Sequence, residues 1–240
     1  EYNEGVFVGY RYYDKKEMAV RYPFGHGLSY TTFEYSDIKL SDTAVGDDDI
    51  LTVNVVITNT GNCAGKEIVQ LYVADKSGFA VRPEKELKDF IKIELQPGER
   101  KTVTFRLDKR AFSYYNEELG DWYAPNGKYD IMIASSSRDI RLTAEVTHKT
   151  AVKLPFVATE NTVFGEFMDY AEGKATIDLL FSKVAKGLLG GDHFEPEAVR
   201  SMIGSMPLRQ IRSFGGISDE LLHQAVDMLN KDFGGFKAQM

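Results

Sequence analysis

The chain has 240 residues, of which 43% are hydrophobic, so it is long enough for one large domain or two small ones with a real core. Its net charge of −7 argues against nucleic acid as the main partner, because binding to a phosphate backbone relies on an excess of basic residues. The single cysteine, Cys63, excludes an internal disulfide and a cysteine-based zinc site, and it fits a reducing compartment such as the bacterial cytoplasm. No apolar run approaches the roughly 18–20 residues of a membrane span.

The opening segment, 1–33, has the pattern of neither a regular strand nor a helix. It contains "EGVFVGYRYYD" at 4–14 and "RYPFGHGLSYTTF" at 21–33, which are rich in rings and glycines. We predict that these rings pack against another surface, since exposed rings in such number would favour aggregation. The aromatic candidates are Phe7, Tyr10, Tyr12, Tyr13, Tyr22, Phe24 and Tyr30. Because the chain opens at Glu1 rather than at Met, we also expect it to be a piece of a longer protein.

The middle of the chain alternates apolar and polar residues, which places one row of side chains on a core and the other in water. Five runs show this clearly, at 51–57, 69–73, 103–107, 129–133 and 140–146, and turn residues such as "NTGN" and "APNGK" separate them. With "FEYSDIKL" and "ELKDFIKIEL" they make seven short strands, which predicts an immunoglobulin-like or fibronectin type III-like sandwich over 34–147. The predicted core comprises Val53, Val55, Leu71, Val73, Val103, Phe105, Ile131 and Ile133.

After Val146 the period changes to that of helices. Apolar residues recur three and four apart at 177–188 and again at 221–229, and Ser218 is a plausible N-cap for the second run. Pro196 and Pro207 suit the first turns of two more helices. We therefore expect a linker and a helical extension over 148–240, which makes the whole chain mainly β with an α-helical C-terminal part.

Few residues suggest chemistry. The four histidines are scattered and form no H-x-x-x-H pair, and "GDDDI" at 46–50 lacks the closing Glu of an EF-hand, so no metal site and no cofactor are expected. Trp122 and Tyr123 lie beside three acids within "NEELGDWYAPNG" and could form a sugar subsite. Aromatic cover for the edge of the sandwich is the favoured interpretation, and no catalytic residue is predicted.

The opening motifs resemble a known junction. "EGVFVGYRYYD" followed by "YPFGHGLSYTTFEYS" is similar to the stretch in glycoside hydrolase family 3 enzymes, the β-glucosidases and β-xylosidases, that joins an α/β sandwich domain to a fibronectin type III-like domain. Further similar stretches follow in order, namely "VNVVITNTGNCAGKEIVQLYVAD", "RPEKELKDFIKIELQPGERKTVTFRL" and "LGDWYAPNGKYDIMIASSSRDIRL". The resemblance covers 1–147, and 160–240 resembles helical extensions of some bacterial β-glucosidases.

The resemblance implies that the chemistry lies elsewhere. A retaining glycosidase needs two carboxyl groups about 5–5.5 Å apart, and in this family they come from a barrel and from the α/β domain, both expected before Glu1. The expected partners are therefore the catalytic domains of the same enzyme, which alone meet the carbohydrate, and this chain by itself is expected to be inactive on aryl β-glucosides. His26 and Arg82 join the seven rings as expected domain-interface residues. Residues 82–90, with Arg82, Lys85 and Glu86 as rim charges, are either a second docking strip or a plain edge strand.

Two other classes stay open, a stand-alone carbohydrate-binding module and a structural sandwich without any enzyme. The first needs a planar row of exposed aromatics, for which Trp122, Tyr123 and Tyr115 are the candidates. The second leaves the opening motif without a purpose. We also expect possible homo-oligomers, because Val6, Val8, Tyr10 and Tyr12 alternate and residues 5–13 could add an edge strand to a second copy.

Overall fold

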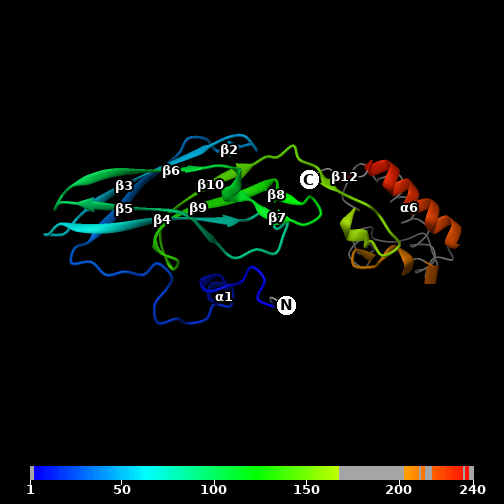
Figure 1. Ribbon diagram of the computed structural model, residues 1–240, viewed down its shortest axis with the longest axis horizontal. Helices are drawn as coiled ribbons and strands as arrows, with labels where there is room; N and C mark the ends of the chain where they lie inside the picture. The colour runs from blue at the N-terminus through cyan, green and yellow to red at the C-terminus, as the bar shows by residue number, and fades with distance from the viewer. Residues whose placement is uncertain (1–2, 168–202, 211, 214–217, 235, 238–240) are drawn as a thin grey trace, which may run out of the picture. The chain divides into compact units, whose positions relative to one another are not determined.

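The computed structural model describes residues 3–167, 203–210, 212–213, 218–234 and 236–237 (Figure 1). The chain forms two compact units, Glu1–Ala151 and Val152–Met240. The first unit is a β-sandwich that carries the opening segment, and the second contains the helical part of the chain. The predicted run of helix at 177–188 and the predicted first turn at Pro196 lie outside the described residues.

All seven predicted strands are present in the sandwich. They are β1 (Phe33–Leu40), β3 (Leu51–Asn59), β4 (Gly65–Asp75), β5 (Glu86–Leu95), β6 (Arg100–Leu107), β9 (Gly127–Ser136) and β10 (Asp139–His148). One sheet has the order β1-β3-β6, and the other has the order β2-β10-β9-β4-β5 with the short β2 (Ala44–Val45) paired in parallel to the end of β10. The sandwich expected from the period-two pattern is therefore confirmed.

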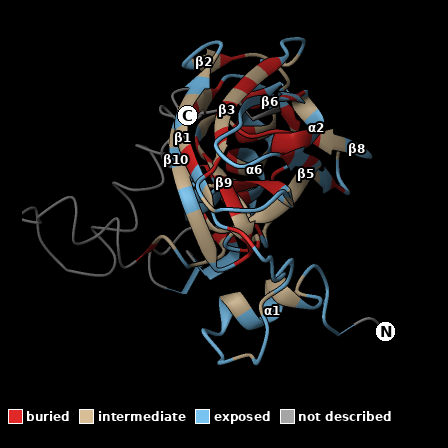
Figure 2. Ribbon diagram, turned by 90° about the vertical axis from the view of Figure 1, so that its left-hand side faces the viewer, coloured by how far each residue is buried: buried red, intermediate tan, exposed pale blue. Residues whose placement is uncertain are grey.

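The core lies between the two sheets, where Figure 2 shows the buried residues gathered along the strands. All eight residues predicted for the core are buried, and β3 alternates buried and half-buried side chains along its whole length. Phe105 of β6 is 1% exposed and stands opposite Val53 of β3 in the ladder. Period-two alternation thus identifies the inner face of each sheet correctly.

Four short elements do not follow from the pattern. Helix α1 (Tyr10–Lys15) begins after Gly9, and helix α2 (Lys109–Phe112) begins where the Asp108 side chain accepts a hydrogen bond from the Arg110 backbone. Strands β7 (Tyr114–Asn116) and β8 (Asp121–Tyr123) form a separate hairpin. Because α1 is a helix and 3–9 holds no strand, the expected edge strand at 5–13 is wrong.

The second unit has a small core of its own. Helix α6 (Asp219–Phe233) is capped at its start by Ser218 and ends at Gly234, whose left-handed conformation suits glycine. Its buried side chains pack with those of 156–167 and 203–208, which include the 3₁₀ turns η1 (Phe164–Glu166) and η2 (Leu208–Gln210). Strands β11 (Leu154–Pro155) and β12 (Phe236–Lys237) pair beside them. The helix predicted at 221–229 and its N-cap are thereby confirmed.

Candidate docking surface

The opening segment covers the outer face of β4. Gln70 and Tyr72 belong to the row that the alternation assigned to water, yet they are 3% and 0% exposed. Gln70 donates from Nε2 to the carbonyl oxygens of Gly25 (3.1 Å) and Ser135 (2.7 Å), and it accepts from the hydroxyl of Tyr72 (2.7 Å). A Cβ at residue 25 would meet Oε1 of Gln70 at 2.2 Å, so this approach requires glycine. Residues 69–74 of β4 are therefore buried on both faces, and the exposure predicted for Gln70 and Tyr72 is wrong.

Tyr10 is the aromatic anchor of this cover. Its ring stacks on Phe24 with centroids 4.6 Å apart and meets Tyr72 edge-on at 6.2 Å. Its phenol oxygen accepts a hydrogen bond from the backbone N–H of Leu87 at 2.8 Å. A large ring with a polar tip thus fills the space above the sheet and binds its edge strand at the same time.

Helix α1 runs antiparallel to the residues that open β5, and four contacts follow one another. Lys15 pairs with Glu84 (2.6 Å) and Asp14 with Lys85 (3.0 Å). Arg11 pairs with Glu86 (3.0 Å), and Tyr10 then accepts from Leu87. We call Glu84–Leu87 the acceptor strip, because these residues receive the helix. Of the two alternatives for 82–90, a docking strip or a plain edge strand, these contacts favour the docking strip, whose partner is the chain's own opening segment.

Arg138, in the turn between β9 and β10, holds the end of α1. Its Nε donates to Asp14 at 2.9 Å, and its Nη2 donates to the carbonyl oxygens of Tyr13 (3.3 Å) and Met18 (2.7 Å). The Asp14 side chain, 7% exposed, therefore lies between the cations Arg138 and Lys85. A guanidinium at this place satisfies carbonyls that a short helix leaves free at its end.

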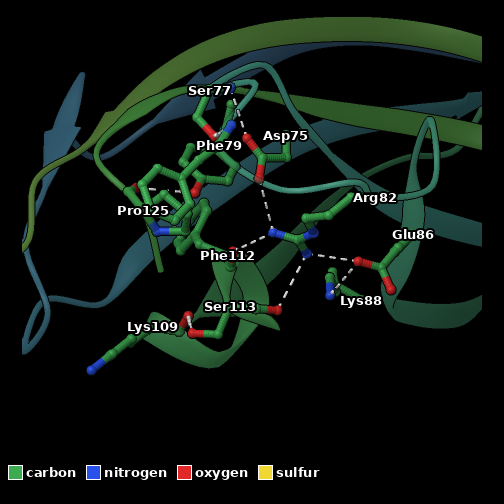
Figure 3. Close-up of polar contacts among 11 residues, drawn as sticks. Asp75, Ser77, Phe79, Arg82, Glu86, Lys88, Lys109, Phe112, Ser113 and Pro125 are labelled. Carbon is green, nitrogen blue, oxygen red and sulfur yellow. Dashed lines mark hydrogen bonds and ion pairs between the residues drawn. The ribbon is translucent and has the colours of Figure 1, made fainter. Parts of the chain in front are cut away.

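The Arg82 side chain is buried among polar partners rather than solvated at a rim (Figure 3). Its side chain is 8% exposed and donates to Asp75 (3.2 Å), to Glu86 (2.7 Å) and to the carbonyl oxygens of Phe112 (2.7 Å) and Ser113 (3.2 Å). Burial acts to raise the pKa of the Glu86 carboxyl, but the cations Lys88, Arg82 and Arg11 outweigh it and hold that pKa below its ordinary value. Arg82 fixes α2 and the acceptor strip to one another, so it supports the surface from beneath.

The other expected interface residues are half-buried or exposed. Phe7 is half-buried, and Tyr12 and Tyr13 are each 42% exposed. Tyr22 is exposed and stacks on the imidazole of His26 with centroids 5.5 Å apart. Tyr30 has a fully exposed ring. The segment therefore has an anchored side, centred on Tyr10 and Asp14, and an exposed aromatic side.

A groove of about 730 Å³ lies between residues 25–33 and the sandwich. Glu67 and Asp139 line it; the Tyr35 hydroxyl donates to Glu67 at 2.6 Å, and Arg141 pairs with Asp139 at 2.7 Å. Burial raises the pKa of the Glu67 carboxyl. The Glu67 carboxyl is bound by Tyr35 and the Asp139 carboxylate by Arg141, so this groove presents no free pair of carboxyl groups of the kind that a retaining glycosidase uses.

Trp122 and Tyr123 do not form a sugar platform. Tyr123 is fully buried beside Phe79 and Tyr114. Trp122 is half-buried, the guanidinium of Arg110 lies over its ring, and Tyr115 meets it edge-on at 5.6 Å. These rings cover the end of the sandwich, which favours the cover interpretation over a planar binding row.

Comparison with known proteins agrees with this architecture. The sequence profile of the fibronectin type III-like domain family matches residues 67–137. The chain is 45% identical over 232 residues to thermostable beta-glucosidase B of Acetivibrio thermocellus, which covers 96% of this chain and 31% of that protein. It is also 45% identical over 167 residues to an exo-alpha-(1->6)-L-arabinopyranosidase of Bifidobacterium breve, covering 70% of this chain and 22% of that protein.

Among solved structures, the GH3 beta-glucosidase of Bifidobacterium adolescentis superposes with a TM-score of 0.63 at 43% identity, over 70% of this chain and 24% of that one. The chain belongs to glycoside hydrolase family 3. It spans less than a third of the length of these curated relatives.

In the part of the chain that the structure describes, no three His, Cys, Asp or Glu side chains gather as metal ligands. No helix among those residues is long and apolar enough to cross a membrane. The feature of this chain that suggests a function is its opening segment, with one anchored and one exposed side. The sequence motif "YRYYDK" marks the anchored side.

Proposed function

We propose that this chain is the non-catalytic docking part of a β-glucosidase-like enzyme of glycoside hydrolase family 3. Its partners are catalytic domains that lie outside these 240 residues, and carbohydrate is met only through them. The observation that carries the proposal is the division of the opening segment into an anchored and an exposed side. Of the seventeen large apolar side chains that the structure describes as exposed, nine lie within residues 6–30. An apolar surface of this density is typical of an interaction site.

The sugar is selected outside this chain in our proposal. Two relatives that match it at the same 45% identity have names that specify different sugars, a beta-glucosidase and an arabinopyranosidase. A part shared so evenly between them supports positioning rather than recognition of one sugar. Docking of a rigid module contributes to catalysis by holding the reacting groups in place.

The docking role is tested by supplying the catalytic part separately. Beta-glucosidase B of A. thermocellus is truncated by the 232 residues that match this chain, and the purified chain is then titrated into it. We expect binding, and we expect at least tenfold weaker binding when Leu28 and Tyr30, 94% and 101% exposed, are both changed to Ser. Tyr115→Ser, which removes a 51% exposed ring from the β7–β8 hairpin, is the matched control. No binding at all, or equal loss in the control, contradicts the proposal.

Catalytic silence is tested on the chain alone. We expect no turnover of aryl β-glucosides by the purified protein, because its groove offers no free pair of carboxylates. Glu67→Gln serves as the decisive variant, since it removes the half-buried carboxyl of the groove while keeping the size of the side chain. Turnover by the wild-type chain that this substitution abolishes would show that the chain is itself an enzyme.

A further inference from the structure

The ion pairs between α1 and the acceptor strip form an alternating pattern of complementary charges. From Glu84 to Glu86 the strip has the signs minus, plus and minus, and the facing residues Lys15, Asp14 and Arg11 have the signs plus, minus and plus. A shift of the helix by one contact would bring like charges together. Complementary charges of this kind set register and exclude wrong partners more than they add affinity.

Contacts with uncharged groups hold the helix at both of its ends. At one end the Tyr10 ring lies between Phe24 and Tyr72 and accepts from the Leu87 backbone. At the other end Arg138 donates to two carbonyl oxygens of the segment. Aromatic anchors in desolvated positions contribute much of the energy at interfaces. The helix is thus held by contacts from three parts of the sandwich, namely Tyr72 of β4, the acceptor strip and Arg138.

The tether that follows, residues 25–31, is held by separate polar contacts. Residues 25–31 contribute polar contacts through Gly25, Cys63 and Asn59, while Leu28 and Tyr30 are exposed almost completely. We propose that the acceptor strip, together with Tyr72 and Arg138, is a self-contained recognition site for a short helix of the pattern Tyr-Arg-x-x-Asp-Lys. The site binds this segment even when the segment belongs to a separate polypeptide. This goes beyond the docking role, because it requires no catalytic domain.

The test cuts the tether in the folded chain. A specific protease site is inserted after Leu28, the full chain is purified and cleaved, and the two pieces are followed by gel filtration and native mass spectrometry. We expect residues 1–28 to remain bound at micromolar concentration and low salt, and to be released progressively as salt rises, since exposed and half-buried ion pairs are screened. Immediate separation of the pieces at low salt would overturn the proposal.

Two variants with the same change in charge distinguish specific recognition from non-specific association. Both are placed in the released piece, so the sandwich itself is unchanged. Asp14→Lys reverses the charge that Lys85 and Arg138 bind, and we expect at least tenfold weaker association. Glu17→Lys makes the same charge change at an exposed residue of the same segment and should leave association unchanged. Equal effects of the two variants would also overturn the proposal. Failure of docking to catalytic domains leaves this result untouched, because no catalytic domain is present.

Discussion

The backbone N–H of Leu87 donates to the phenol oxygen of Tyr10 at 2.8 Å, a bond between residues 77 positions apart. Leu87 lies in β5, the edge strand of its sheet, where a backbone donor has no further strand to pair with. The opening segment therefore satisfies and shields an edge that would otherwise be open to another chain. This hydrogen bond therefore makes the position of the opening segment depend on the folded sheet.

Tyr10→Phe isolates that hydrogen bond. The ring keeps its stack on Phe24, so we expect a loss of about 1 kcal/mol in the free energy of unfolding from the missing acceptor. Urea unfolding followed by circular dichroism measures it. Tyr12→Phe, in a 42% exposed ring, is the control and should change little. If the two variants unfold alike, the Leu87 bond carries no stability of its own.

Arg82 should be the most sensitive charged residue of the sandwich. Arg82→Met leaves Asp75 and Glu86 without their shared cation and frees two carbonyl oxygens, so we expect a cost of about 3–5 kcal/mol. Arg100→Met breaks the exposed pair with Asp37 and should cost at most about 1 kcal/mol. Thermal unfolding of the three proteins side by side decides the matter, and similar midpoints for the two variants would contradict it.

The inner face of the sandwich could be predicted because its signal is local. Alternation in 51–57 or 103–107 is a property of consecutive residues, and it identifies Val53 and Phe105 as members of the face that the opposite sheet covers. The outer face could not be predicted in the same way. Gln70 and Tyr72 have the positions of a solvated row, and they are buried only because residues 45 or more positions away lie across them.

Helix α1 escaped prediction for a related reason. The alternation of Val6, Val8, Tyr10 and Tyr12 favours a strand, and a helix of six residues has too few internal hydrogen bonds to form on its own. Its conformation comes from Arg138 and the acceptor strip, which no local pattern reveals. The charge of Arg82 predicts a place at a rim, because charged residues are usually solvated, and only the fold shows the four acceptors gathered around it.

Phe105→Ala tests the core itself. Truncating a ring that is 1% exposed should cost about 3–5 kcal/mol, through lost burial and the cavity left behind. Phe90→Ala removes the same atoms from a ring that is 60% exposed on β5, and we expect a far smaller change. Denaturant titration of both variants gives the comparison. An unchanged midpoint for Phe105→Ala would remove this residue from the core.

His148 should make the sandwich sensitive to acid. Its fully buried ring, at the end of β10, lies against Phe112 and Tyr129, with centroids 5.6 and 6.2 Å away. Burial lowers the pKa of the imidazole below its ordinary 6.5, although the charge of Asp47 opposes this. Well above pH 6.5 the ring is neutral in both states. Below it the unfolded chain takes up a proton that the folded chain resists, so stability falls as the pH is lowered through this range.

The slope of this loss is bounded by one proton, which corresponds to at most about 1.4 kcal/mol per pH unit. Thermal unfolding between pH 7.5 and roughly pH 5 measures it, with His148→Phe as the variant that removes the titrating ring while keeping an aromatic side chain. We expect the variant to show a shallower decline than the wild-type chain over this interval. Phe90→Ala, which removes an exposed side chain without a titratable group, should retain the wild-type slope. A decline that is the same in all three proteins would assign the acid sensitivity to other groups, because His148 would then take up its proton equally in both states.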